Sequence, residues 1–158
     1  MKALPDGWPR ISATLYYDDA RAAIDWLCRV FDFELRLLVE TGDGGVAHSE
    51  LVYGDGVIMI SQTTADWLSP KTVGGNTQGL MVYVDDVEAH CAKARAGGAT
   101  ILTELKISDY GADYWVDRSY GVRDPGGHTW WFAQRITTGN PEWSKVRMKR
   151  DKSHHEPG

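Results

Sequence analysis

His48 and Glu50 are the two residues of this 158-residue chain whose types and spacing best suit joint chemistry. They lie two positions apart in VAHSELVY, a run typical of a strand, so their side chains share one face with bases about 7 Å apart. An imidazole beside a carboxylate can serve as a general base with an orienting group, or supply two metal ligands. The same spacing also fits a plain hydrogen-bonded or solvent-facing pair. Both interpretations remain open.

A second candidate region is YGVRDPGGHTWWFAQ, residues 120–134. Its Asp-Pro-Gly-Gly segment predicts a tight turn, and the following run predicts a strand. Adjacent side chains on a strand point to opposite faces, so Trp130 and Trp131 are expected to have different surroundings. One of them can pack in a core while the other faces a binding site.

Several other classes of site lack their usual patterns. The chain has no glycine-rich phosphate loop after a strand and no serine nucleophile elbow. Cys28 and Cys91 have no second Cys or His at ligand spacing, so we expect buried thiols. His90 has no partner by spacing and is expected at the flank of a helix.

Charge and hydropathy limit the partners. The formal net charge is −5, which disfavours a nucleic-acid backbone as partner. No apolar run approaches the roughly 20 residues of a membrane span, and no signal-peptide pattern is present, so we expect a cytoplasmic protein without membrane contact.

The elements that must position these residues occur in a repeated order. A strand over 11–17, an amphipathic helix over 20–31 and three strands over 33–40, 46–53 and 57–61 make the first module, residues 11–61. Residues 62–77 contain Pro, Gly, Ser and Thr and predict a linker. The second module, residues 78–134, repeats the order, with later strands over 99–105, 114–123 and 128–134.

The repeat is visible in the residues themselves. An offset of 67 aligns Tyr16 with Tyr83 and the Asp18-Asp19 pair with Asp85-Asp86. We therefore predict an α+β fold of two βαβββ modules that form an open, cup-shaped eight-stranded sheet with the helices outside. A single domain over 1–135 is followed by a polar, partly disordered tail over 136–158.

This arrangement resembles the vicinal oxygen chelate superfamily, which includes glyoxalase I, extradiol dioxygenases and bleomycin resistance proteins. Within it, HSELVYGDGVIMIS and YWVDRSYGVRDPGGHTWWF are similar to the PhnB-like branch. The resemblance implies a ligand-holding cup and a homodimer. It also implies that His128, where relatives carry Asn or His, secures the turn.

The superfamily's enzymes bind one divalent metal through four strand positions. Transferred to this chain, these positions are Ser12, Met59, Gly79 and Trp131. Glycine offers no side chain, indole offers only a donor, and a thioether is a poor ligand for a hard or borderline cation. We therefore expect neither the usual metal nor any other cofactor, and we do not transfer the metal-dependent activities.

The four transferred metal positions also indicate which face of each strand points into the cup. If Ser12 and Trp131 face the cup, strand alternation predicts that their neighbours on the same faces do so too and that the intervening residues face the helices. The expected ligand-binding residues are Ser12, Thr14, Tyr16, His48, Glu50, Met59, Tyr83, Trp115 and Trp131. Trp67, in the linker, is a candidate lid residue. Trp131 can offer a stacking platform or can simply fill the space of a ligand.

Three functions follow from this set of residues. The first is a metal-independent small-molecule-binding protein of the bleomycin-resistance type that holds a planar or partly apolar compound, including an antibiotic, in an aromatic cup. The second is a lyase, isomerase or dioxygenase-type enzyme that uses His48 and Glu50, with or without a metal at another position. The third is a structural dimer module whose cup is filled by its own aromatic rings.

Overall fold

The helices and strands of the computed structural model follow the predicted repeat, and the structure describes residues 2–112 and 114–139. The first module contains β1 (Ala13–Tyr17), α1 (Ala20–Phe31), β2 (Glu34–Glu40), β3 (Val46–Tyr53) and β4 (Gly56–Gln62). The second module contains β5 (Gly79–Tyr83), α3 (Val87–Ala96), β6 (Thr100–Asp109), β7 (Val116–Arg123) and β8 (Thr129–Thr137). No helix within these described ranges is long and apolar enough to cross a membrane.

Both long helices begin directly after an Asp-Asp pair, whose second residue is the N-cap. The Asp19 carboxylate accepts from the Ala22 N–H, and the Asp86 carboxylate accepts from the N–H groups of Glu88 and Ala89. These bonds satisfy backbone donors that have no partner inside the helix. The second Asp of each aligned pair is therefore the cap of the helix that follows it.

Two segments differ from the expected boundaries. The predicted linker contains a one-turn helix, α2 (Pro70–Val73), which begins after the N-cap residue Ser69. The last strand, β8, continues to Thr137, two residues into the segment predicted as a tail. Residues 140–158 of that tail lie outside the described residues.

The eight strands form two mixed four-stranded sheets, with orders β1-β4-β3-β2 and β5-β8-β7-β6. The parallel pair β1–β4 aligns Ala13 with Ile58, and β5–β8 aligns Leu80 with Trp130. Adding 67 to the β1 residue numbers 13–16 and 72 to those of their β4 partners gives paired residues of β5 and β8. This match confirms the two-module architecture. The eight predicted strands are thus divided between two separate four-stranded sheets.

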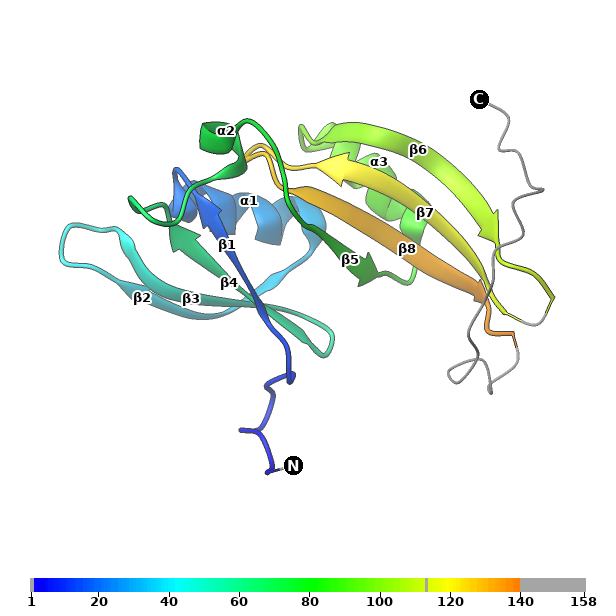
Figure 1. Cartoon of the computed structure of the whole chain (residues 1–158), viewed down its shortest axis with the longest axis horizontal. Coiled ribbons are helices and arrows are strands. Elements are labelled where there is room, and N and C mark those ends of the chain that lie inside the picture. The colour runs from blue at the N-terminus through cyan, green and yellow to red at the C-terminus, as the bar shows by residue number, and fades with distance from the viewer. Residues whose placement is uncertain (1, 113, 140–158) are drawn as a thin grey trace.

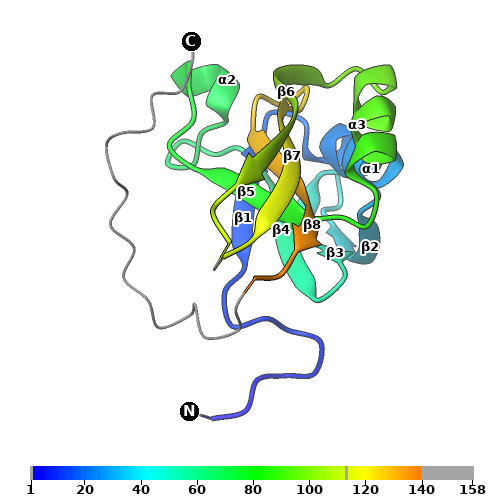
Figure 2. The ribbon, with the colours of Figure 1, turned by 90° about the vertical axis from the view of Figure 1, so that its right-hand side faces the viewer.

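The sheets lie side by side along the long axis, with β1 and β5 on their neighbouring edges (Figure 1). Helices α1 and α3 lie together on one side of both sheets, as Figure 2 shows. The other side carries exposed apolar side chains such as Met81 and Tyr83. We call this side the open face.

The core joins the two modules through the helix side. The ring of Phe31, the last residue of α1, packs edge-on against Trp130 and Phe132 of β8, with centroid distances of 5.6 and 4.7 Å. The Trp26 indole N–H of α1 donates to the Gly97 carbonyl at 2.9 Å. A Cβ at Gly97 would lie 2.6 Å from both Val30 methyl groups, so only glycine permits this close approach.

The prediction for His90 was wrong, because its side chain is buried at the junction of the modules. It is 6% exposed, its Nδ1 lies 2.7 Å from the Tyr120 hydroxyl, and its Nε2 lies 3.4 Å from the Phe31 carbonyl. A carbonyl can only accept, so the neutral ring donates from Nε2 and accepts from Tyr120 at Nδ1. Burial lowers the pKa of His90, although the Phe31 carbonyl opposes that shift.

This burial predicts an acid-side loss of stability. Below the ordinary histidine pKa of about 6.5, the unfolded chain binds a proton that the buried His90 of the folded chain does not readily accept. The free energy of unfolding therefore decreases as the pH is lowered, by at most about 1.4 kcal/mol per pH unit. Urea denaturation between pH 7 and pH 5 should show a steeper loss for the wild type than for His90→Gln. The prediction would be contradicted if the free energy of unfolding changed equally with pH in the wild type and in His90→Gln.

Candidate functional site

The open face of the two sheets carries the residues predicted for a ligand site. The eight residues predicted to face the helices are all buried in the core or packed against it: Leu15, Ile58, Ile60, Leu80, Val82, Val84, Trp130 and Phe132. On the opposite side, Thr14 pairs with Met59, Tyr16 with Ser61 and Met81 with Trp131. The predicted alternation is therefore present in both modules.

Trp131 is a partly exposed indole on this face. Its side chain is 38% exposed, whereas Trp130 beside it is fully buried. A Cβ at Gly121, its partner on β7, would lie 3.3 Å from the Trp131 ring and 3.3 Å from Thr103. The indole thus lies against the bare backbone of β7, where any larger residue would displace it.

Tyr16 lies beside a cavity beneath the connection between the modules. The cavity has a volume of about 320 Å³, and Thr14, Tyr16 and His128 line it together with part of 66–78. Trp67 from this connection stacks on Tyr16 with ring centroids 5.1 Å apart and an interplanar angle of 11°. Trp67, the candidate lid residue, is therefore already in contact with the predicted site.

The turn beside this cavity is fastened by the residues expected to do so. The His128 backbone N–H donates to Asp124, and its Nε2 lies 2.9 Å from the Tyr16 carbonyl, to which it donates. His128 therefore secures the Asp-Pro-Gly-Gly turn and also connects it to β1.

A charged cluster that the sequence analysis missed occupies the far end of the same sheet. Arg135 donates to the Asp117 carboxylate and to the Tyr83 hydroxyl. Its guanidinium lies 5.1 Å from the Tyr83 ring centroid and 5.0 Å from that of Trp115. Its bond to Asp117 raises the pKa of Arg135, which keeps this cation charged between two rings. The sequence does contain a signal for this residue. If the last predicted strand is extended beyond Gln134, strand alternation places Arg135 on the same face as Trp131.

His48 and Glu50 form a hydrogen-bonded pair on β3. His48 Nε2 lies 3.0 Å from Glu50 Oε1, and Arg36 Nε donates to the other carboxylate oxygen at 2.7 Å. The bonds from His48 and then Arg36 lower the pKa of Glu50. Arg36 itself lies over the Trp8 ring at 4.7 Å. The carboxylate is thus ionised and orients His48, a geometry that suits both interpretations of the pair.

The four positions at which relatives hold a metal do not suit a cation here. Met59, Gly79 and Trp131 present a thioether, no side chain and an indole. Ser12 offers a hydroxyl oxygen, which is buried and has no hydrogen-bond partner among residues 2–112 and 114–139. Within the same ranges no group of three or more His, Cys, Asp or Glu side chains could hold an ion.

Comparisons with known proteins agree with this architecture. Residues 11–132 match the family model described as Glyoxalase/Bleomycin resistance protein/Dioxygenase superfamily. The uncharacterized protein Mb0911c of Mycobacterium bovis is 30% identical over 145 residues, which cover 89% of this chain and 92% of that protein. Rv0887c of Mycobacterium tuberculosis is likewise 30% identical, with 82% of its length covered.

Solved structures show the same fold. TioX from Micromonospora sp. ML1 is 32% identical with a TM-score of 0.65, covering 82% of this chain and all of that one. A glyoxalase/bleomycin resistance protein/dioxygenase family enzyme from Burkholderia phytofirmans PsJN has a TM-score of 0.60 at 16% identity, over 79% of this chain and 97% of its own. The chain therefore belongs to the glyoxalase/bleomycin resistance protein/dioxygenase superfamily.

Proposed function

We propose that this chain is a metal-independent small-molecule-binding protein that holds a planar or partly apolar ligand on its open face. The observation that carries the proposal is the exposed Trp131 indole, which lies against Gly121 with Met81 beside it. A flat ring system gains both apolar burial and favourable ring geometry on such a surface. A planar antibiotic is a ligand of this kind, and we place the chain in the PhnB-like branch on its two motifs.

A second copy of the chain is the partner that this proposal includes. Met81, Tyr83 and Trp131 are 56%, 47% and 38% exposed on one side of the second sheet. Leu37 and Val39, paired with Glu50 and His48, are 41% and 44% exposed on the first. Exposed apolar side chains on both sheets of one face favour an interaction surface there. In a cytoplasmic homodimer, two such faces would enclose the ligand.

The variant that tests this proposal is Trp131→Ala. It should weaken binding of the best ligand from a panel of planar aromatic antibiotics about tenfold, because stacking and apolar burial are both lost. Trp131→Phe, which keeps a ring, should lose less affinity.

Isothermal titration calorimetry measures the affinity of both variants and of the wild type. Sedimentation velocity on the same samples reports whether the protein is a dimer. Equal affinity in all three proteins would contradict the proposal. Failure of every compound to bind would favour a structural module.

The hydrogen-bonded pair His48 and Glu50 supports a second candidate function, an enzyme of the lyase, isomerase or dioxygenase type. His48 is 3.0 Å from a carboxylate that Arg36 also binds, as a positioned general base requires. Mass spectrometry of the ligand recovered from the titration separates the two functions. An unchanged ligand supports binding without turnover, whereas a product that disappears with His48→Gln supports the enzyme.

A further inference from the structure

A separate cavity of about 260 Å³ lies on the helix side of the molecule, away from the open face. It is bounded by the β1–α1 junction at 17–19, the first turns of α1, the turn at 124–126 and Lys71 of α2. The two modules therefore each supply part of its wall. Its volume lies below the roughly 300–1,000 Å³ of sites for drug-sized ligands, so it suits a smaller molecule.

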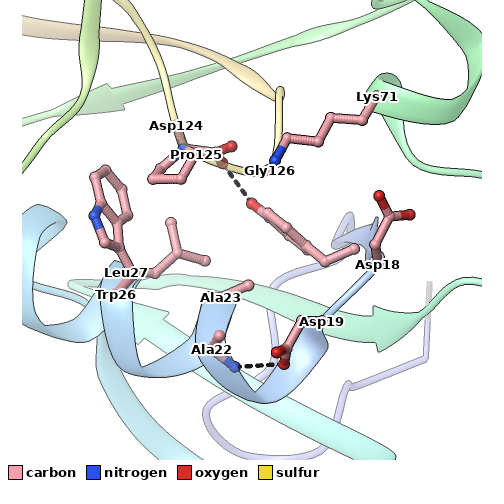
Figure 3. Close-up of a pocket in the computed structure, with 11 residues that line it drawn as sticks. Asp18, Asp19, Ala22, Ala23, Trp26, Leu27, Lys71, Asp124, Pro125 and Gly126 are labelled. Carbon is pink, nitrogen blue, oxygen red and sulfur yellow. Dashed lines mark hydrogen bonds between the residues drawn. The ribbon is translucent and has the colours of Figure 1, made fainter.

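The cavity has an apolar end and a charged end, as Figure 3 shows. Trp26, Leu27 and Pro125 lie together at the apolar end. The Asp18 carboxylate lies at the opposite end, and the Lys71 side chain extends above it toward the turn (Figure 3). A ligand that fits both ends must combine an apolar body with a charged head.

Two of the three carboxylates that line the cavity are already used. Asp19 accepts from the Ala22 N–H at 2.9 Å as the cap of α1. Asp124 is 4% exposed and accepts from three donors, the Tyr17 hydroxyl at 2.6 Å, the Trp130 indole at 2.9 Å and the His128 N–H at 3.0 Å. Both carboxylates therefore already accept hydrogen bonds from the protein itself.

The remaining two charges have no partner in the part of the chain that the structure describes. Within residues 2–112 and 114–139, neither the Asp18 carboxylate nor the Lys71 ammonium makes a hydrogen bond or an ion pair, with each other or with any other group. The cavity thus offers one anion at Asp18 and one cation, the Lys71 ammonium, which lies toward the turn at Gly126 (Figure 3). A ligand head carrying both signs would satisfy the two groups together.

The internal repeat supplies a matched cavity for comparison. At the offset of 67, Asp18, Ala22 and Trp26 correspond to Asp85, Ala89 and Lys93, which line a cavity of about 250 Å³. There Lys93 already forms an ion pair with Asp32. The second cavity therefore has a satisfied lysine where the first has an apolar indole.

We propose that the first cavity binds a free α-amino acid with an aromatic or branched apolar side chain. Asp18 binds its ammonium group, Lys71 binds its carboxylate, and its side chain packs against Trp26, Leu27 and Pro125. The site is independent of the open face and of the ligand proposed there. Partly exposed ion pairs contribute little, so the expected dissociation constant is on the order of 1 mM.

The test uses the full-length chain labelled with ¹⁵N and titrated with L-phenylalanine. Chemical-shift changes are expected at the Trp26 indole and the Gly126 amide, which line the cavity. Two analogues separate the charges, because phenethylamine lacks the carboxylate and 3-phenylpropionate lacks the ammonium. Both should bind more weakly than L-phenylalanine. Absence of shifts at these two sites would overturn the proposal.

Three surface variants assign the charges. Lys71→Gln should weaken L-phenylalanine about three- to fivefold and leave phenethylamine unchanged, whereas Asp18→Asn should weaken both by a similar factor. Asp85→Asn, the equivalent change in the second cavity, should alter neither. If the two cavity variants bind L-phenylalanine as the wild type does, the cavity recognises only apolar groups, and recognition of both charges is refuted.

Discussion

Phe31→Ala is expected to lower the free energy of unfolding by about 3–5 kcal/mol. Phe31 is fully buried, and its ring lies within 6 Å of the ring centroids of four other residues: Trp26, His90, Trp130 and Phe132. Removing the ring loses its apolar burial and leaves a cavity that rigid aromatic neighbours cannot fill. Urea denaturation followed by circular dichroism measures the change.

Phe31→Leu is the matched control, and its cost should be smaller because much of the volume is kept. Since Phe31 belongs to α1 but packs against β8, its loss should weaken the contact between the modules as well as the first module itself. A loss below about 1 kcal/mol for Phe31→Ala would show that the modules do not depend on this ring.

Asp124→Ala is expected to cost roughly 3–5 kcal/mol, because three donors lose their acceptor at once and each buried unsatisfied group costs about 1–3 kcal/mol. Tyr17 and Trp130 are 3% and 0% exposed, so two of the donors that lose the carboxylate belong to buried side chains. Burial, and then the charge of Asp124, also raises the pKa of Tyr17, so its hydroxyl stays protonated as a donor. Thermal and urea denaturation give the stability change.

Tyr17→Phe is the control for Asp124, since it removes one donor and leaves two. It should cost about 1 kcal/mol. The carboxylate connects β1 of the first module with the turn and β8 of the second, so the larger change should also loosen the turn at 124–127. Equal effects of the two substitutions would mean that the other two hydrogen bonds contribute nothing.

Much of the fold was predictable because its signals are local. Helix α1 begins after a capping Asp and has one apolar face, and the predicted range 20–31 is the observed one. The matching strand registers follow from the repeat. The short helix α2 was missed although Ser69 followed by Pro70 is a local start signal, because the Gly-rich residues after it favoured a loop.

The candidate site was predictable only in part because its contacts are distant in sequence. The position that Trp131 shares with a metal ligand of the resembling superfamily predicted that it faces the cup, but nothing near it in the chain indicates that Gly121 makes room for its ring. His90 finds its partners 30 and 59 residues away, at Tyr120 and Phe31. Helical periodicity cannot reveal partners on other elements, so the histidine was assigned to the helix flank.

The equal registers of the two sheets allow the two halves to differ at matched positions. Two identical modules would carry the same residue at the positions of Trp26 and Lys93. Because both modules lie in one chain, a substitution changes one copy without changing its twin. The indole in one module and the ammonium group at the equivalent place in the other are such a difference.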